Sequence, residues 1–275
     1  MNKKRYGQFY TTNYDYILEG FDKPSCKIVE PFAGKGDLLE WVGHKNWEAY
    51  DIDPKRSDIL KRDTLINPPS YKDSFVITNP PYLARNKSSS KIIYDKYGMN
   101  DLYKCFIISL VESECLGGIL IIPCGFFLSP RDKDVKCRNF FLSKYKICKV
   151  KYFEETVFDD TTTTVVAFSF IKSDLPLDTQ SIIWEKKPTC ETKIFELSRV
   201  NKWIIAGDIY NIPKNPTIKV SRFVKNKKTY TFWIWKHRIV WPPLLNMVFI
   251  PCSKVINELY QMYALYVPPI RIWHH

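Results

Sequence analysis

Between residues 27 and 172, short apolar runs alternate with amphipathic stretches, and this alternation constrains the fold more than any other feature of the chain. It is typical of βα units, in which helices cover a mostly parallel sheet. The predicted strands are Lys27–Phe32, Trp47–Ile52, Phe75–Thr78, Gly118–Pro123, Lys149–Glu154 and Thr164–Lys172. The predicted helices are Asp37–Gly43, Asp101–Cys115 and Asp132–Lys144, with Asp101 and Asp132 as N-cap residues. We therefore expect an α/β fold with a Rossmann-like sheet.

The end of this region predicts a change of strand direction and then a second domain. Only a few residues, from Phe158 to Thr161, separate the last two predicted strands, so no crossover helix fits and the last strand should run antiparallel. From Ser173 onward prolines are dense, aromatic residues cluster and the βα rhythm ends. We expect a first domain over residues 1–172 and a smaller domain over residues 173–275, in which Tyr230–Trp241 alternates like a strand.

Cysteine and histidine usage bears on the compartment and on metal binding. None of the eight cysteines forms a Cys-x-x-Cys pair, and most stand in apolar surroundings, as buried free thiols do in a reducing compartment. No apolar run is long enough to span a membrane, and no long apolar stretch follows the basic start of the chain. We expect a cytoplasmic protein without a membrane partner. With only four histidines, we expect no metal site.

The positive charge is concentrated in the second predicted domain. The net charge is +12, and residues 173–275 carry 15 basic and 7 acidic side chains. No acidic residue lies between Asp208 and Glu258. A one-sided basic excess is typical of nucleic-acid binding, although a solvated basic surface explains the charge alone equally well. The candidate phosphate-binding residues are Lys214, Lys219, Arg222, Lys225, Lys227 and Lys228.

Polar and glycine features stand at the ends of the first three strands. The first strand runs from Glu30 into a turn with Phe32, Gly34 and Gly36, and a helix follows. Glycines let a ligand approach the backbone, and a helix start presents free N–H groups. Asp51 ends the second strand, where an acid can grip the hydroxyls of a ribose, and Asp63 would end a third short strand. The spacing matches neither the Gly-x-Gly-x-x-Gly fingerprint nor a P-loop.

The most specific element is Asn79-Pro80-Pro81-Tyr82, directly after the apolar strand Phe75–Thr78. In a doubly wound sheet this strand end lies beside the glycine turn, at the point where the strand order reverses. The Asn79 side-chain oxygen and the Pro80 carbonyl can accept both hydrogens of an aryl amine, and Tyr82 can stack on a base turned out of its helix. Asn67-Pro68-Pro69 follows no apolar strand and is expected to be a loop.

Taken together, these motifs resemble those of an adenine-specific amino-methyltransferase of restriction–modification type, in which the cofactor motif precedes the catalytic one. The resemblance covers about residues 5–170. It implies a methyl transfer from S-adenosylmethionine to N6 of adenine in a short specific double-stranded DNA sequence, with base flipping. The segment Gly7–Thr12 resembles the family's N-terminal cofactor segment, which implies that Thr11 grips the methionine carboxylate. The implied cofactor-binding residues are Phe9, Thr11, Glu30, Phe32, Gly34, Gly36, Asp51 and Asp63, and the implied catalytic residues are Asn79, Pro80 and Tyr82.

The resemblance also implies partners and leaves alternatives open. Residues 173–275 would be the target-recognition domain by position alone, double-stranded DNA would be the partner, and a cognate restriction endonuclease could act on the same site. The same catalytic motif serves methylation of RNA adenine or of a protein glutamine. The glutamine methylators usually place a helical domain before the cofactor motif, and here about 25 residues precede it. A non-catalytic DNA-binding subunit is a third alternative. The Phe158–Thr164 segment fits a plain hairpin as well as a base-supporting loop.

Overall fold

The computed structural model describes residues 7, 9–43, 45–158, 163–174 and 177–205, together with the strands at 218–222, 230–235 and 238–240. The chain divides into two compact units, Met1–Ile205 and Ala206–His275. The first unit contains every predicted catalytic and cofactor-binding residue. Within the described part of the chain, no helix has both the length and the apolar character needed to cross a membrane.

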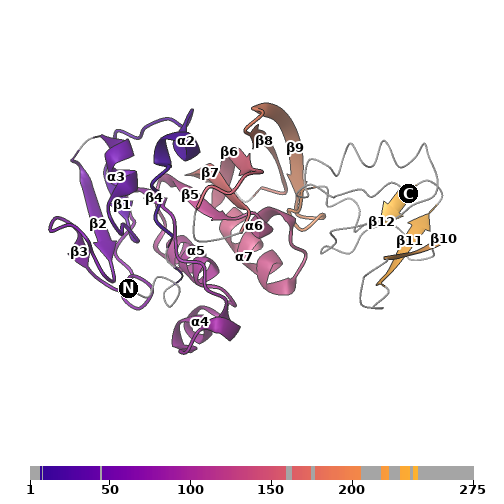
Figure 1. Ribbon diagram of the computed structural model, residues 1–275, viewed down its shortest axis with the longest axis horizontal. Coiled ribbons are helices and arrows are strands. Elements are labelled where there is room, and N and C mark those ends of the chain that lie inside the picture. The colour runs from indigo at the N-terminus through magenta and orange to yellow at the C-terminus, as the bar shows by residue number, and fades with distance from the viewer. Residues whose placement is uncertain are drawn as a thin grey trace. The chain divides into compact units, whose positions relative to one another are not determined.

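A nine-stranded sheet forms the frame of the first unit, in the order β3-β2-β1-β4-β5-β7-β6-β8-β9 (Figure 1). The strands are β1 (Ile28–Glu30), β2 (Trp47–Asp51), β3 (Leu60–Lys61), β4 (Phe75–Thr78), β5 (Gly117–Pro123), β6 (Tyr145–Phe153), β7 (Val165–Lys172), β8 (Thr179–Lys187) and β9 (Glu191–Ser198). The five strands from β3 to β5 pair parallel with one another. The predicted α/β fold with a mostly parallel sheet is confirmed.

The strand β7 lies between β5 and β6 and runs antiparallel to both. This confirms the prediction made from the short connection after Phe158, because a hairpin can return the chain only in the opposite direction. The pairing of β6 with β7 shifts between Ile147 and Lys149, where one strand holds an extra residue. The sheet therefore has the reversed strand that we expected at the end of the first domain.

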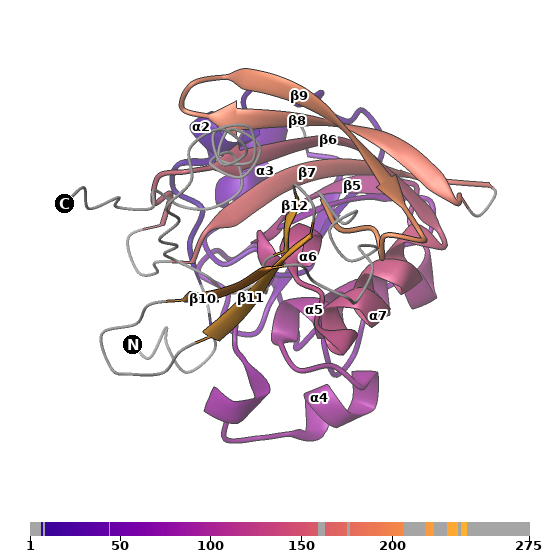
Figure 2. The same ribbon diagram turned by 90° about the vertical axis from the view of Figure 1, so that its right-hand side faces the viewer.

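Helices cover both faces of the sheet, so the sheet lies between two layers of helices (Figure 2). On one face α2 (Tyr14–Leu18) and α3 (Asp37–Val42) pack over side chains such as Ile119 and Ile121. On the other face lie α5 (Leu102–Ser113), α6 (Gly125–Leu128) and α7 (Asp132–Leu142). There the ring of Phe126 stacks on Phe168 at 5.8 Å between centroids. Burial on both faces explains why the strands are near-continuous apolar runs.

The structure corrects the domain boundary that we predicted after Lys172. The strand β8 pairs parallel with β6, and β9 pairs antiparallel with β8, so residues 179–198 extend the same sheet. Along β8 the side chains of Gln180, Ile182 and Trp184 are buried while their neighbours Thr179 and Ser181 are exposed. This alternation is that of a strand with one covered face. The prolines nearby hid the pattern, and the compact unit continues to Ile205.

The three predicted helices are confirmed as α3, α5 and α7, with small differences at their ends. Asp101 is the N-cap of α5, but α7 begins at Asp132 itself and Arg131 is its N-cap. The sequence did not predict the short α2 and α6, the 3-10 helix η1 (Arg85–Lys87) or α4 (Ile92–Tyr97). These helices have three to six residues and carry too few turns to show a clear 3.6-residue period.

The second unit contains a separate antiparallel sheet in the order β10-β11-β12. Its strands are β10 (Ile218–Arg222), β11 (Tyr230–Trp235) and β12 (Arg238–Val240). Where we expected one alternating strand over Tyr230–Trp241, the structure has two paired strands, with Trp233 opposite Val240.

Candidate active site

A cavity of about 290 Å³ opens at the carboxyl ends of the parallel strands. It lies where the strand order reverses, because the chain runs outward from β1 to β2 on one side and to β4 on the other. In an open α/β sheet this is the position at which ligands bind. Six of the predicted site residues line it: Phe9, Phe32, Gly34, Asp51, Asp63 and Asn79. Sequence positions 9 to 79 therefore converge on one space.

The two glycines of the first turn adopt left-handed backbone conformations, with φ of 54° at Gly34 and 83° at Gly36. A Cβ on Gly34 would lie 3.0 Å from the Tyr10 ring, and a Cβ on Gly36 would lie 2.5 Å from Nη1 of Arg56. Both positions therefore favour glycine for conformation, and Gly34 also for space, whereas the flexible Arg56 side chain near Gly36 can move aside. Gly36 is the N-cap of α3 and, unlike Gly34, is not among the residues that line the cavity.

Asp51 is held rigidly at the end of β2. Its Oδ2 accepts a hydrogen bond from the Gly34 amide at 2.8 Å, and its Oδ1 accepts one from the Asp53 amide at 2.7 Å. The residue is 3% exposed and still contributes to the cavity wall. Each carboxylate oxygen has further lone pairs, so Asp51 can accept ligand hydroxyls while it stays fixed.

Asp63 follows β3 and organises the next turn of the cavity wall. Its Oδ1 accepts hydrogen bonds from the amides of Leu65 and Ile66, each at 3.1 Å. The neighbouring Thr64 hydroxyl donates to the Pro31 carbonyl at 3.0 Å, which ties this turn to the end of β1. Asp63 thus lies on the cavity at a strand end, as the sequence predicted.

The side-chain amide of Asn79 has a fixed orientation. Its Nδ2 donates to the Phe9 carbonyl at 2.9 Å and to the Thr11 hydroxyl at 3.1 Å. Because these two bonds use both amide hydrogens, Oδ1 is left as the acceptor end of the group. Asn79 is 8% exposed and lines the cavity. The neighbouring Pro81 also lines it, whereas Pro80 does not appear in the wall.

Tyr82 lies beside Asn79 rather than in the cavity wall. Its hydroxyl is 2.5 Å from Asn79 Oδ1 and 2.7 Å from the Ile121 carbonyl, and its ring packs 5.3 Å from Phe9. Burial raises the pKa of the Tyr82 phenol well above its ordinary value, so the hydroxyl stays protonated and acts as the donor. An amide oxygen accepts two hydrogen bonds, so Asn79 Oδ1 keeps capacity for a second donor.

Thr11 and Glu30 lie behind the cavity wall. The Thr11 hydroxyl, in a residue that is 4% exposed, accepts from Asn79, and the backbone of Thr11 bonds to the Asp37 carboxylate. Glu30 is 2% exposed, and its Oε2 has no hydrogen-bond partner. Burial, with the carboxylates of Asp37 and Asp51 adding to it, raises the pKa of Glu30 well above its ordinary value. The structure thus places Thr11 against Asn79, a contact that the sequence did not reveal.

The sequence missed several residues of the cavity wall. Tyr10 and Arg62 contribute beside residues that were predicted, and a run of three serines, Ser88–Ser90, contributes from the segment after the Asn-Pro-Pro-Tyr turn. Tyr10 and Arg62 could have been predicted, because each stands next in the sequence to a predicted residue. Nothing local to the serine run indicates that it bends back toward Asn79.

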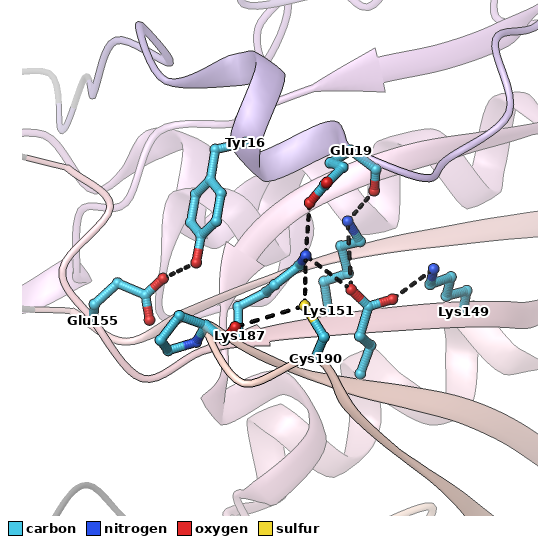
Figure 3. A network of polar contacts seen from close by, with 9 residues as sticks. Tyr16, Glu19, Lys149, Lys151, Glu155, Lys187 and Cys190 are labelled. Atoms are coloured by element: carbon cyan, nitrogen blue, oxygen red, sulfur yellow. Dashed lines mark hydrogen bonds and ion pairs between the residues drawn. The ribbon is translucent and has the colours of Figure 1, made fainter.

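A polar network anchors the N-terminal segment that carries Phe9 and Thr11 (Figure 3). The Lys187 ammonium contacts Glu19 Oε2 at 2.6 Å, Glu185 Oε1 at 3.2 Å and Cys190 Sγ at 3.2 Å. The Tyr16 hydroxyl bonds to Glu155, and Lys151 bonds to the Glu19 carbonyl. The network thereby fixes α2 and the turn after it to β6 and β8. From the sequence we expected β8 in the second domain, apart from α2 and β6.

Two further predictions fall partly or wholly outside the described residues. Of the candidate phosphate-binding side chains, Lys219 and Arg222 lie on β10, whose side chains are not described, and Lys214, Lys225, Lys227 and Lys228 lie outside. In the hairpin connection Phe158 is 4% exposed and packs into the core, 6.3 Å from the Phe9 ring. Residues 159–162 of that connection lie outside the described part.

With this geometry in place, the fold is similar to that of proteins of type I restriction–modification systems. A protein of a type I restriction–modification system superposes with a TM-score of 0.52 at 15% identity, over 66% of this chain and 45% of that one. A protein from Vibrio vulnificus YJ016, assigned as a modification subunit of a type I restriction enzyme, superposes with a TM-score of 0.50 at 13% identity, over 68% and 50%. At these identities the likeness concerns the fold alone.

Sequence similarity points to the same class of protein. Residues 45–158 match the family described as Eco57I restriction-modification methylase. The chain is also 26% identical over 198 residues to the Type II methyltransferase M.AccI of Acinetobacter calcoaceticus. That alignment covers 59% of this chain and 36% of the relative, so the chain spans about a third of the relative's length. The chain is therefore similar in sequence to restriction–modification methyltransferases, over residues 45–158 in the family comparison.

Proposed function

We propose that the first unit transfers a methyl group from S-adenosylmethionine to the N6 amine of an adenine, in a short specific sequence of double-stranded DNA. The observation that carries the proposal is the Asn79 amide. Its two hydrogens are engaged by Phe9 and Thr11, so its oxygen is the acceptor end and, beside the Tyr82 hydroxyl, keeps room for a second donor. Asn79 shares one cavity with Gly34, Asp51 and Asp63. An acceptor fixed beside a cofactor-sized space is what methylation of an amine requires.

The cavity fits the proposed cofactor in size and in chemistry. About 290 Å³ is close to the lower end of small-ligand pockets. The carboxylates of Asp51 and Asp63 suit a ribose and an adenine amine, and the aromatic ring of Phe32 suits a flat base. When bound, S-adenosylmethionine supplies the electrophilic methyl group.

The chain's own groups explain how a poor nucleophile is activated. The lone pair of an aryl amine is delocalised into its ring. Asn79 Oδ1 and the Pro80 carbonyl accept the two amine hydrogens, and this keeps more of the lone pair on the nitrogen and less of it in the ring. The prolines at 80 and 81 stiffen the turn and carry no competing N–H. Positioning and hydrogen bonding carry most of the rate enhancement, and the proton leaves to water.

Delivery of the base to Asn79 requires the target nucleotide to leave the helix, because N6 of a paired adenine lies inside the duplex. We assign Tyr82 the stacking role on the flipped base. Its hydroxyl is engaged by Asn79 and Ile121 in the structure, so stacking requires the ring to turn away from Phe9. Exchange of the Tyr82 hydroxyl for the adenine amine at Asn79 Oδ1 would accompany that turn.

Sequence recognition is assigned by position to the part of the chain beyond the catalytic sheet. Its basic residues, Lys214, Lys219, Arg222, Lys225, Lys227 and Lys228, would contact phosphates. Since the relatives are restriction–modification methyltransferases, a restriction endonuclease that acts on the same DNA sequence is the proposed functional partner.

The proposal is tested by offering one methyl donor to competing acceptors. The protein is incubated with S-adenosylmethionine labelled in the methyl group and with equal masses of mixed-sequence DNA, total RNA and a protein extract. We expect label in DNA alone, on adenine, and at a recurrent sequence when the modified positions are mapped. Label in RNA or on glutamine would establish one of the alternative substrates. No label in any acceptor, from protein that binds S-adenosylmethionine, would favour a non-catalytic subunit.

A further inference from the structure

The segment between β4 and α5 forms a rim over the cavity. Residues Ser88–Ser90 line the same cavity as Asn79, and Ser89 and Ser90 are exposed. The two ends of the segment lie side by side, because the Arg85 amide donates to the Asn100 carbonyl at 2.9 Å. The serine rim, Ser88–Ser90, is therefore a fixed feature of the cavity mouth.

Hydrogen bonds within the segment occupy carbonyl groups of the serine rim and leave backbone amides without a partner. The Lys91 ammonium bonds to the carbonyls of Arg85 and Ser88, and the Ser88 hydroxyl donates to the Ser90 carbonyl at 2.8 Å. Within the described chain the amides of Ser89 and Ser90 have no hydrogen-bond acceptor. Two adjacent free amides, with two serine hydroxyls beside them, make a surface suited to an oxyanion.

The charged side chains in sequence beside the serine rim are positive, which suits an oxyanion. From Arg85 to Lys91 the chain carries three basic residues and no acidic one. Arg85 is paired with Asp95 at 2.7 Å, and Lys91 is engaged by the rim carbonyls. Lys87 is exposed and makes no ion pair with any described residue. The rim thus combines hydrogen-bond donors with one available cation.

We propose that the serine rim and Lys87 bind the phosphates that flank the flipped nucleotide. The inference rests on the proposed function and adds a contact surface in the catalytic unit, separate from the basic residues of the second unit. A base that reaches Asn79 inside the cavity remains bonded to its sugar and phosphates, which must stay at the mouth. The rim supplies donors and a positive charge at that place.

The test compares two small ligands that differ only in their phosphates. Deoxyadenosine and deoxyadenosine 3′,5′-bisphosphate are titrated calorimetrically into protein saturated with S-adenosylhomocysteine, so that the cofactor region is filled. We expect the wild type to bind the bisphosphate about tenfold more tightly than the nucleoside. Lys87→Gln combined with Ser89→Ala and Ser90→Ala removes the charge and the two hydroxyls but keeps the backbone amides, so it should reduce that preference severalfold. Lys193→Gln, an exposed lysine on β9, should keep it.

Equal affinity of the wild type for the two ligands would overturn the inference, and so would a preference that is unchanged in the triple variant. Methyl transfer to DNA is measured on the same wild-type preparation. Transfer without a phosphate preference would leave the proposed function intact and remove the rim. A phosphate preference that depends on the rim, in a protein that methylates no DNA, would keep the rim and remove the proposed function.

Discussion

Asn79 takes its orientation from residues that lie 68 and 70 positions earlier in the chain, Thr11 and Phe9. An amide that could rotate would present oxygen and nitrogen in turn, and only the oxygen can accept an amine hydrogen. Two donated hydrogen bonds therefore fix the amide in the orientation that the proposed role of Asn79 requires. In this account Thr11 is a positioning residue for Asn79, whereas the sequence resemblance implied a contact with the methionine carboxylate.

Replacement of Thr11 separates these two roles. Thr11→Val removes the hydroxyl that accepts from Asn79 at 3.1 Å, while Thr11→Ser retains it. Loss of one hydrogen bond of about 1 kcal/mol should lower kcat roughly fivefold in the valine variant. The dissociation constant of S-adenosylmethionine, measured by calorimetry, should stay within twofold, and the serine variant should match the wild type. A weakened cofactor affinity with unchanged kcat would support the carboxylate role instead.

Glu30 gives the site a pH-dependent stability. Burial raises the pKa of Glu30 in the folded protein, so the folded state holds its proton at pH values where the unfolded chain has lost it. The corresponding stability is fully present below the ordinary pKa of about 4.3 and is lost as the pH rises through the folded-state value. A glutamine at this position is neutral at every pH.

Glu30→Gln should therefore gain free energy of unfolding over the wild type as the pH rises. Between the two pKa values the difference should grow by about 1.4 kcal/mol per pH unit. Urea unfolding of both proteins at several pH values measures it, with the exposed Glu191→Gln as a control that shows no such trend. A difference that is constant with pH would mean that Glu30 is already ionised in the folded protein.

At the residue scale, strand ends were the positions that the sequence could predict. Asp51 and Asn79 stand at the ends of predicted strands and Asp63 follows a short third one, and parallel strands bring their carboxyl ends to one edge. The contact between Thr11 and Asn79 could not be predicted, because side-chain geometry across 68 residues leaves no periodic signal. The same holds for the serine rim, which is a plain polar run in the sequence.

At the scale of elements, the strands β6 and β8 hold the N-terminal segment against the sheet. Lys187, at the end of β8, is 4% exposed and joins Glu19 to Glu185. Its hydrogen bond to Glu19 raises the pKa of Lys187, so the ammonium stays charged. Its removal would leave Glu185 with Lys149 and Lys151 alone.

Lys187→Met should destabilise the first unit by about 1–3 kcal/mol, the range for hydrogen bonds to charged groups. Glu19→Gln should cost less, because the Glu19 side chain is 62% exposed and water screens its ion pair. Urea unfolding at neutral pH measures both, and Lys193→Met on the exposed side of β9 serves as the matched control. An unfolding free energy equal to that of the control would show that the network does not stabilise the fold.

The strands and helices themselves could be predicted where they contain a clear run of apolar residues. The strands β1, β2, β4 and β5 and the helix α5 are apolar because both sheet faces are covered, and that run of apolar residues is visible in the sequence. The strands β8 and β9 were not recognised, since prolines and exposed residues such as Ile183 and Ile194 interrupt the expected contrast. Short elements such as α4 lack a period altogether.

At the scale of the whole molecule, the proposal assigns methyl transfer to the first unit and DNA recognition to the basic C-terminal part. The cavity and the serine rim lie in the first unit, and the excess of positive charge lies in the second half of the chain. Phosphate contacts contribute to affinity for any DNA and position the protein, while base contacts determine the sequence that is chosen.

Neutralising three of the C-terminal basic residues, for example Lys225, Lys227 and Lys228, tests this division. Each lost phosphate contact should reduce the magnitude of the log–log salt slope by roughly 0.9, so the triple variant should lose about two to three units. Binding to matched and unmatched duplexes should weaken alike. Titrations at several salt concentrations give the slope. An unchanged slope would mean that these side chains form a solvated surface away from DNA.

The central claim is that Asn79 activates the N6 amine of adenine inside this cavity. The most direct measurement is the amount of N6-methyladenine formed in mixed-sequence DNA by the wild type and by Asn79→Ala, quantified by mass spectrometry of the digested DNA. We expect N6-methyladenine from the wild type and a rate lower by about 10²–10³ in the variant, with cofactor and DNA affinities retained. Near-equal rates in the two proteins, or modification of cytosine in place of adenine, would contradict the account.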